Sequence, residues 1–123
     1  MAASLIPIPD AELQVLKVMW AVDRPTAREI TEAIYGKATT SNVGTVQTLL
    51  QRLEKKGCVK RDRSEYVHRF SANVSEADVA GRQLEILAAK VSGGSLVPFI
   101  THLVQAKRLS RKEKEAIRRL LEE

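Results

Sequence analysis

Small, polar and basic side chains share one face of the segment 42–56. At about 100° per residue, the apolar positions of this segment fall together on one side of a helix: Val46, Leu49, Leu50 and Leu53. The other side carries Gly44, Thr48, Gln51 and Lys55, with Gln47 and Arg52 on its flanks. Glutamine can pair with adenine through two hydrogen bonds, threonine can offer a hydroxyl or a methyl group, and arginine and lysine can reach guanine or phosphate. Such a surface suits the major groove of DNA.

The segment that follows this helix adds positive charge. From Arg52 to Arg69, seven basic residues stand against three acidic ones, which concentrates a net charge of +4. The predicted DNA-contacting residues are Asn42, Gly44, Thr45, Gln47, Thr48, Gln51, Arg52, Lys55, Lys56, Arg61 and Arg63. Residues 44 to 52 of this set are expected to contact bases, and the two lysines to hold phosphates. A solvated helix face and a solvated hairpin tip are the ordinary alternatives for such residues.

Two shorter helices are predicted before this segment. Behind Asp10, a competent N-cap, apolar residues recur at helical spacing as far as position 22. The pattern Thr26 to Glu29 is that of a capping box, and Gly36 lies near the expected end of the second helix. In the third helix, Asn42 can cap the start and Gly57 can supply the left-handed residue after the end.

A hairpin is predicted directly after the third helix. Cys58 and Val59 start an extended run, the charged residues 60–65 form its tip, and Tyr66, His68 and Phe70 alternate with their neighbours as in a strand. Three helices followed by a two-stranded hairpin are the winged form of the helix-turn-helix, in which the third helix enters the major groove and the hairpin lies along the backbone.

The second half of the chain is predicted to be helical. Ser75 to Asp78 is a capping pattern, the glycines 93 and 94 break the helix, residues 96–104 are nearly all apolar, and Ser110 opens a last helix. The predicted fold is mainly α with a small β-hairpin, with a winged helix-turn-helix domain over 1–73 and a helical dimerisation region over 74–123. Helices this apolar need a partner, so we expect a homodimer. Its expected contact residues are Val79, Leu84, Leu87, Val91, Leu96, Phe99, Ile100, Leu103, Ile117, Leu120 and Leu121.

Composition narrows the class of protein. The 123 residues carry a formal net charge of +5, which suits a polyanionic partner. No apolar run reaches the roughly 18 to 20 residues of a membrane span, and the single Cys58 fits a reducing compartment, so we expect a cytoplasmic protein without membrane insertion. We find no phosphate loop, metal-ligand spacing or nucleophile motif, and therefore expect neither an enzyme nor a cofactor or metal.

Two other residues, and the winged domain as a whole, have alternative interpretations. His68 has only His102 as a possible histidine partner, so it is interpreted as a residue of the hairpin and not as a metal ligand. Cys58 is expected to be a small buried thiol; a thiol-responsive DNA-binding regulator is the alternative. A winged-helix module that binds protein and no DNA is a further alternative, although a protein-binding face would be more apolar than this one.

Five stretches of the sequence resemble the penicillinase-repressor (BlaI/MecI) family of bacterial regulators. They are LQVLKVMW, TAREITEAI, TVQTLLQRLEKKGCVKR, YVHRFSANVSEADV and LSRKEKEAIRRLLEE. The resemblance runs nearly end to end. It implies a homodimeric repressor that binds a palindromic operator in double-stranded DNA at the promoter of a resistance or stress-response gene.

The same resemblance implies how repression would be relieved. In such families a membrane metallopeptidase sensor leads to a cut in the dimerisation region at an Asn-Phe bond, and His102 and Leu103 stand at that bond here. They are the candidate proteolytic site, and a signal acting on the C-terminal region is the expected inducer. A copper-responsive branch uses a C-terminal cysteine cluster, which a chain whose only cysteine is Cys58 does not have.

Overall fold

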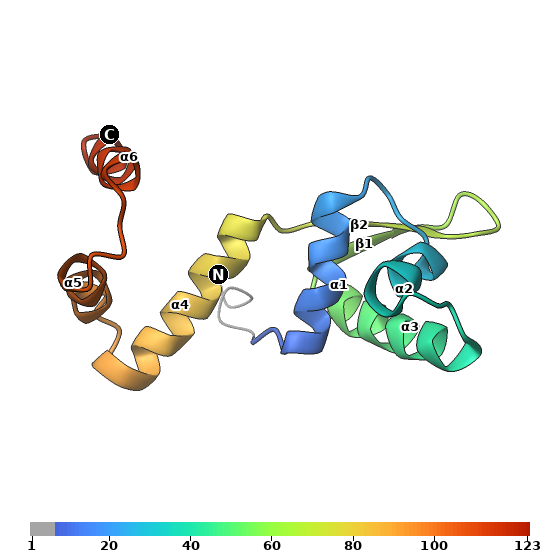
Figure 1. Ribbon diagram of the computed structural model, residues 1–123. Helices are drawn as coiled ribbons and strands as arrows, with labels where there is room; N and C mark the ends of the chain where they lie inside the picture. Colours follow the sequence, from blue (N-terminus) through green and yellow to red (C-terminus); the bar gives the residue numbers. More distant parts are fainter. Residues whose placement is uncertain (1–6) are drawn as a thin grey trace. The chain divides into compact units, whose positions relative to one another are not determined.

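The computed structural model describes residues 7–123, which form helices and one two-stranded hairpin. In chain order the elements are α1 (Asp10–Ala21), α2 (Ala27–Tyr35), α3 (Thr40–Lys55), β1 (Val59–Asp62), β2 (Arg69–Ala72), α4 (Glu76–Ser92), α5 (Val97–Gln105) and α6 (Arg111–Leu121) (Figure 1). This order confirms the predicted fold class. Backbone contacts divide the chain into two compact units, Met1–Leu84 and Glu85–Glu123.

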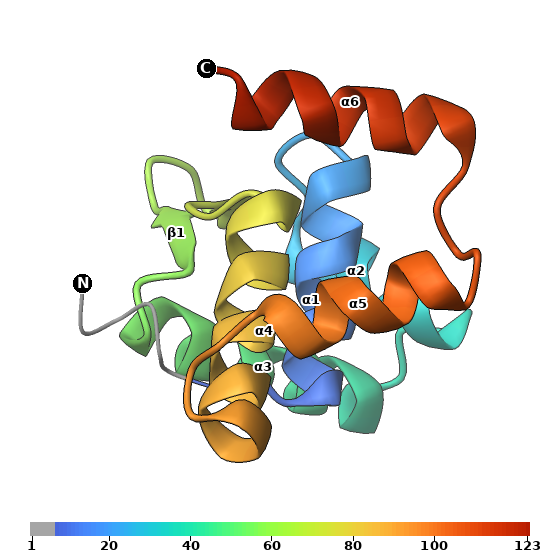
Figure 2. The ribbon, with the colours of Figure 1, turned by 90° about the vertical axis from the view of Figure 1, so that its left-hand side faces the viewer.

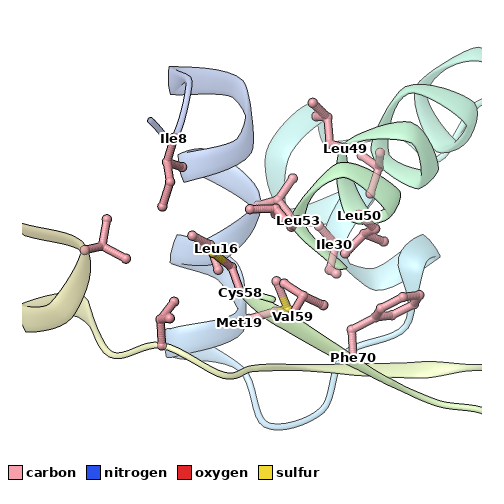
Figure 3. Packing of buried hydrophobic residues seen from close by; sticks show 14 residues of the cluster. Ile8, Leu16, Met19, Ile30, Leu49, Leu50, Leu53, Cys58, Val59 and Phe70 are labelled. Atoms are coloured by element: carbon pink, nitrogen blue, oxygen red, sulfur yellow. The ribbon is translucent and has the colours of Figure 1, made fainter. Parts of the chain in front are cut away.

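The core of the first unit lies where α1, α2 and α3 meet the hairpin (Figure 3). Leu16 of α1, Ile30 of α2 and Leu50 of α3 are completely buried, and Phe70 of β2 closes the cluster. All four apolar positions predicted for the inner face of α3 are buried. Each such leucine contributes about 1.5–3 kcal/mol by leaving water, so this packing fixes the orientation of α3 and the direction in which its other face points.

The ends of α1 and α2 follow local capping chemistry. Pro9, and not Asp10 as predicted, is the N-cap of α1, because its extended backbone lets its carbonyl accept the first helical hydrogen bond, from Leu13 N at 3.0 Å. Asp10 is the first residue of the helix, where its negative charge interacts favourably with the positive end of the helix dipole. The capping box of α2 is confirmed: Glu29 N donates to Thr26 Oγ1, and Thr26 N donates to Glu29 Oε1.

The start of α3 differs from the prediction. Thr39 is the N-cap, since its hydroxyl accepts a hydrogen bond from Asn42 N at 3.1 Å, and the helix begins at Thr40. Asn42 lies in the first turn and its Nδ2 donates to Lys37 O at 3.2 Å, so the predicted cap instead braces the turn before the helix. The prediction for the other end is confirmed, because Gly57 has a φ of +78°, a conformation that side chains disfavour.

The hairpin is antiparallel, with Val59 opposite Ala72 and Arg61 opposite Phe70. Residues 60–62 belong to β1 and the tip is formed by 63–68, so the predicted tip was placed too early. Tyr66 is fully exposed in this tip and not part of a strand as predicted. The alternation that suggested a strand at Tyr66 holds only from Arg69 onward, where pairing with β1 starts.

The predicted helix starts in the second half of the chain are confirmed. Ser75 and Asp78 exchange hydrogen bonds before α4, and Ser110 and Glu113 do so before α6. Figure 2 shows α5 and α6 as separate helices joined by an extended connection. Neither helix has a buried residue. In the described part of the chain no single helix has the length and hydropathy of a membrane span; the bent pair α4 and α5 passes that test only when taken together.

Candidate nucleic-acid interface

The outer face of α3 is exposed to solvent along its whole length. The side chains of the buried face point into the core, as Figure 3 shows for Leu50 and Leu53. The exposed residues are Gly44, Thr45, Gln47, Thr48, Gln51, Arg52 and Lys55. The helix is therefore half core and half free surface, and all the predicted contact residues between Gly44 and Lys55 lie on the free half.

Gly44 leaves space on this face. A Cβ built at this position would meet no heavy atom of the described residues within 4 Å. Its backbone is helical and has no positive φ, so the fold does not require glycine here. The missing side chain instead allows another molecule to approach the helix backbone closely.

The two threonines of the face are oriented by their own helix. Thr45 Oγ1 donates to Ser41 O and Thr48 Oγ1 donates to Gly44 O, both at 3.1 Å. A hydroxyl that has donated its proton still offers acceptor lone pairs. In this arrangement Thr45 and Thr48 can accept a hydrogen bond from an amino group, such as those at base edges.

Gln51 lies between two hollows of the surface. A groove of about 560 Å³ separates α3 from the hairpin, and Gln47, Gln51, Arg61 and His68 are among its lining residues. A second hollow of about 540 Å³ runs along α3 and is lined by Thr48, Gln51, Arg52, Glu54 and Lys55. A glutamine at this place can reach a partner lying on either side of it.

Ion pairs attach the hairpin to α3. Glu54 contacts two arginines of the hairpin: its Oε1 lies 3.3 Å from Arg61 Nε and its Oε2 lies 3.1 Å from Arg63 Nη2. The guanidinium of Arg61 also lies over the ring of Phe70, 4.8 Å from its centroid. Arg63 keeps 60% of its side chain exposed, so it remains available to an anion.

The hairpin is attached to the turn before α2 as well. Arg24 forms an ion pair with Asp62, and Arg69 Nη1 donates to Arg24 O at 2.8 Å. The pKa of the Asp62 carboxyl is lowered, first by the hydrogen bond from Ser64 N and further by Arg24. The lowered pKa means that the ion pair between Arg24 and Asp62 persists to a lower pH than an ordinary aspartate would allow.

Asn42 and Lys56 are engaged in the fold. Asn42 bonds to Lys37 O, as described above, and Lys56 forms an ion pair with Glu12 of α1 and donates to Pro7 O at 3.1 Å. Glu12 is only 2% exposed. Lys56 therefore neutralises a buried carboxylate, which the sequence did not indicate because the two residues are far apart along the chain.

Several residues of this surface were missed by the sequence analysis. Arg28 of α2, Tyr66 and His68 line the groove beside the predicted residues. A signal for Arg28 existed, since it lies in the first turn of the helix before α3, two residues after the capping Thr26. The position of Tyr66 and His68 depends on where the hairpin turns, which alternation alone did not locate.

The remaining candidate residues are placed as follows. Cys58 is buried, with Arg82 Nη1 3.6 Å from its sulfur. Among residues 7–123 no group of three or more histidine, cysteine or acidic side chains is arranged to hold a metal ion. His102 and Leu103 lie within α5. Of the predicted dimer contacts, Val79 is buried in the core of the first unit and Phe99 is half-buried, whereas the others are exposed.

Comparison with known proteins agrees with this architecture. The chain is 30% identical to the penicillinase repressor of Staphylococcus aureus, over 98% of this chain and 95% of the relative. It is 35% identical to the transcriptional regulator BlaI of Mycobacterium tuberculosis, over 98% and 87% of the two chains. The solution structure of the DNA binding domain of the repressor BlaI is similar, with a TM-score of 0.51 and 32% identity over 60% of this chain and 89% of that one. The penicillinase repressor family model matches residues 8–123, and the chain therefore belongs to the penicillinase repressor family.

Proposed function

We propose that this chain is a sequence-specific, DNA-binding transcriptional repressor of a resistance or stress-response gene. The observation that carries the proposal is the exposed outer face of α3, polar and basic, beside a hairpin whose Lys60 and Arg63 are exposed to solvent. Family membership and relatives named as repressors support it. A surface for binding protein would be more apolar, which argues against an interaction module.

Within this function the residues divide by what they can contact. Gln47, Gln51 and Arg52 can pair with base edges, because they project from the part of α3 that borders both hollows. Lys55 and Arg63 are suited to phosphates, since their charges lie at the end of α3 and on the hairpin tip. Asn42 and Lys56 act through the fold, by bracing the start of α3 and pairing with Glu12.

The repressor would act as a homodimer on a palindromic operator in the cytoplasm. The exposed apolar residues of α4, α5 and α6 support pairing of two chains, because a single chain leaves them in water. Two α3 helices related by a two-fold axis would enter major grooves about 34–36 Å apart, or a multiple of that distance.

We also propose that repression is relieved by a signal that acts on the C-terminal region. The proposed route is cleavage at His102–Leu103 in response to a membrane metallopeptidase sensor. The carbonyl of His102 accepts a helical hydrogen bond from Ala106 N at 2.9 Å, and that of Leu103 accepts the bond from Arg108 N at 3.0 Å that closes the end of α5. The cut would therefore require α5 to unwind locally. Mass spectrometry of the protein from cells exposed to a β-lactam tests this route: a fragment ending at His102 supports it, and an intact chain after derepression excludes it.

The DNA-binding function is tested by comparing Arg52→Ala with Lys17→Ala. Both variants lose one positive charge, but Lys17 is an exposed residue of α1 outside both hollows. Gel shifts with a fragment of the chain's own promoter should show that Arg52→Ala weakens binding by about 1–3 kcal/mol, the range for a base contact, and that Lys17→Ala changes it little. Wild-type protein that binds promoter and random DNA equally would contradict the proposal.

A further inference from the structure

Glu54 is an acidic residue in a surface that is otherwise suited to phosphates. It lies on α3 beside Arg52 and Lys55 and lines the same hollow. A carboxylate at such a place repels the DNA backbone whatever the base sequence, so its charge alone weakens binding. Its contacts within the chain indicate what it does instead.

Each oxygen of the Glu54 carboxylate serves a different arginine of the hairpin. Arg61 Nε lies 3.3 Å from one oxygen and Arg63 Nη2 lies 3.1 Å from the other. Glu54 is 27% exposed and Arg61 only 19%, so the inner pair is shielded from water, and the outer one is less so. Within the described residues, the buried Nε of Arg61 makes no hydrogen bond, and the charge of Glu54 is what compensates it.

The link reaches both strands of the hairpin. Arg61 is paired with Phe70 across the two strands, and its guanidinium lies over the Phe70 ring. Phe70 is buried in the core, only 4% exposed. A single carboxylate on α3 is thus connected through Arg61 to β1 and β2, and through Arg63 to the tip.

We propose that Glu54 is a positioning residue that couples the hairpin to α3 and thereby raises the preference for operator over random DNA. When hairpin and helix are held together, they contact DNA as one rigid surface. Only a DNA site that fits the hairpin and α3 at the same time is bound more tightly because of this rigidity. Random DNA is held by phosphate contacts alone, so it gains little from the rigidity and is still repelled by the charge of Glu54. The inference rests on the DNA-binding function proposed above.

The test compares Glu54→Gln with Glu65→Gln in the full-length chain. Both variants lose one negative charge; Glu65 is exposed at the hairpin tip and forms no ion pair within residues 7–123. The probes are a fragment of the chain's own promoter and a scrambled fragment of equal length and composition. The ratio of the two dissociation constants is the measure of specificity.

Glu54→Gln is expected to bind scrambled DNA more tightly than wild type and the promoter no more tightly. The specificity ratio should then fall about fivefold, the scale of two partly exposed ion pairs. Glu65→Gln should tighten binding to both fragments equally and leave the ratio unchanged. If Glu54→Gln also leaves the ratio unchanged, Glu54 acts by charge alone and the inference is wrong.

Hydrogen exchange of the free protein gives a measurement that needs no DNA. Amides of residues 59–72 should exchange faster in Glu54→Gln than in wild type and in Glu65→Gln, because the hairpin is less firmly attached. Equal exchange in all three proteins would also overturn the inference. Wild type without preference for the promoter would instead contradict the proposed function, and the specificity role with it, whatever the exchange rates.

Discussion

At the scale of single residues, Gly44 separates the demands of folding from those of binding. Nothing in the described chain occupies the space where a side chain would stand, and its backbone is helical. Gly44→Ala should therefore stabilise the protein by about 0.5–1 kcal/mol, because alanine loses less conformational freedom in a helix. The same methyl group should weaken promoter binding, since it stands between the helix and the groove. Urea unfolding and gel shifts on the same variant measure both effects.

A loss of stability in Gly44→Ala would show that the space is filled in solution. Unchanged promoter affinity would show that DNA does not approach α3 at this turn. Either result would move the contact surface toward the C-terminal end of the helix, where Gln51 and Arg52 lie.

Lys56 and Glu12 form the ion pair on which stability should depend most. Glu12 is buried, so removing its partner leaves an uncompensated charge in the core. We expect Lys56→Met to lower the free energy of unfolding by about 3–5 kcal/mol. Lys55→Met is the matched control: Lys55, the preceding residue, is exposed, and its loss should change stability by less than about 0.5 kcal/mol.

The double variant Glu12→Gln with Lys56→Met checks the cause. Removing both charges should restore part of the stability lost in Lys56→Met, since no lone charge remains in the core. If the double variant is less stable than Lys56→Met, the loss comes from packing of the lysine stem and not from its charge. Urea unfolding at neutral pH decides between the two.

At the scale of elements, the sequence predicted helices better than their ends. The four apolar positions of α3 repeat locally, so their burial followed from spacing alone. The identity of the N-cap did not follow from the sequence, because Thr39 and Asn42 are both good capping residues. Only the backbone of the turn decides which of the two side chains accepts a hydrogen bond from a free backbone N–H of the first helical turn. The hairpin tip was misplaced for a similar reason. The alternation of side chains extends into the tip, beyond the residues that pair with β1, and the sequence of one strand does not show where its pairing with another begins.

The contacts between elements were outside what the sequence could indicate. Glu54 meets Arg61 and Arg63 only because the hairpin folds back beside α3. Lys56 meets Glu12 only because α1 crosses the end of α3. Both acidic residues were visible in the sequence, but their partners depend on packing between segments, which has no local pattern.

The capping boxes make stability depend on pH. The pKa of Glu29 is lowered mainly by the hydrogen bond from Thr26 N, and those of Asp78 and Glu113 by the equivalent bonds from Ser75 and Ser110. A carboxyl whose pKa is lower in the folded protein contributes stability above its unfolded pKa, and this contribution is lost as pH falls through the folded pKa. The protein should therefore lose stability below about pH 5.

Glu29→Gln tests this dependence at one capping box. The amide can still accept the bond from Thr26 N, so the variant mainly removes the charge. It should be less stable than wild type at pH 7 and approach wild type as the pH falls, because protonation removes the same charge from Glu29. Glu32→Gln, an exposed position of the same helix, is the control and should keep a constant difference. A Glu29→Gln difference that does not change with pH would contradict the assignment.

At the scale of the whole molecule, the exposed apolar surface of the second unit supports the proposed homodimer. Ile117 and Leu120 of α6 are exposed, as are Ile100 and Leu103 of α5, and neither helix buries any residue within one chain. Isolated helices of this length are marginal in water, so their stability must come from packing. A second copy of the chain supplies the same apolar surface, and two-fold pairing would bury both.

The joint change Ile117→Gln and Leu120→Gln tests this pairing. Each apolar side chain buried contributes about 1.5–3 kcal/mol, and a two-fold dimer loses every contact twice, so the dimer dissociation constant should rise by at least about 100-fold. The control is Glu115→Gln with Arg119→Gln, two exposed polar positions of α6 that should leave the dimer intact. Sedimentation at micromolar concentration gives the oligomeric state, and gel shifts should show promoter binding weakened together with dimerisation. A wild-type chain that sediments as a monomer while still distinguishing promoter from scrambled DNA would mean that one α3 is sufficient for recognition and that the apolar helices serve another partner.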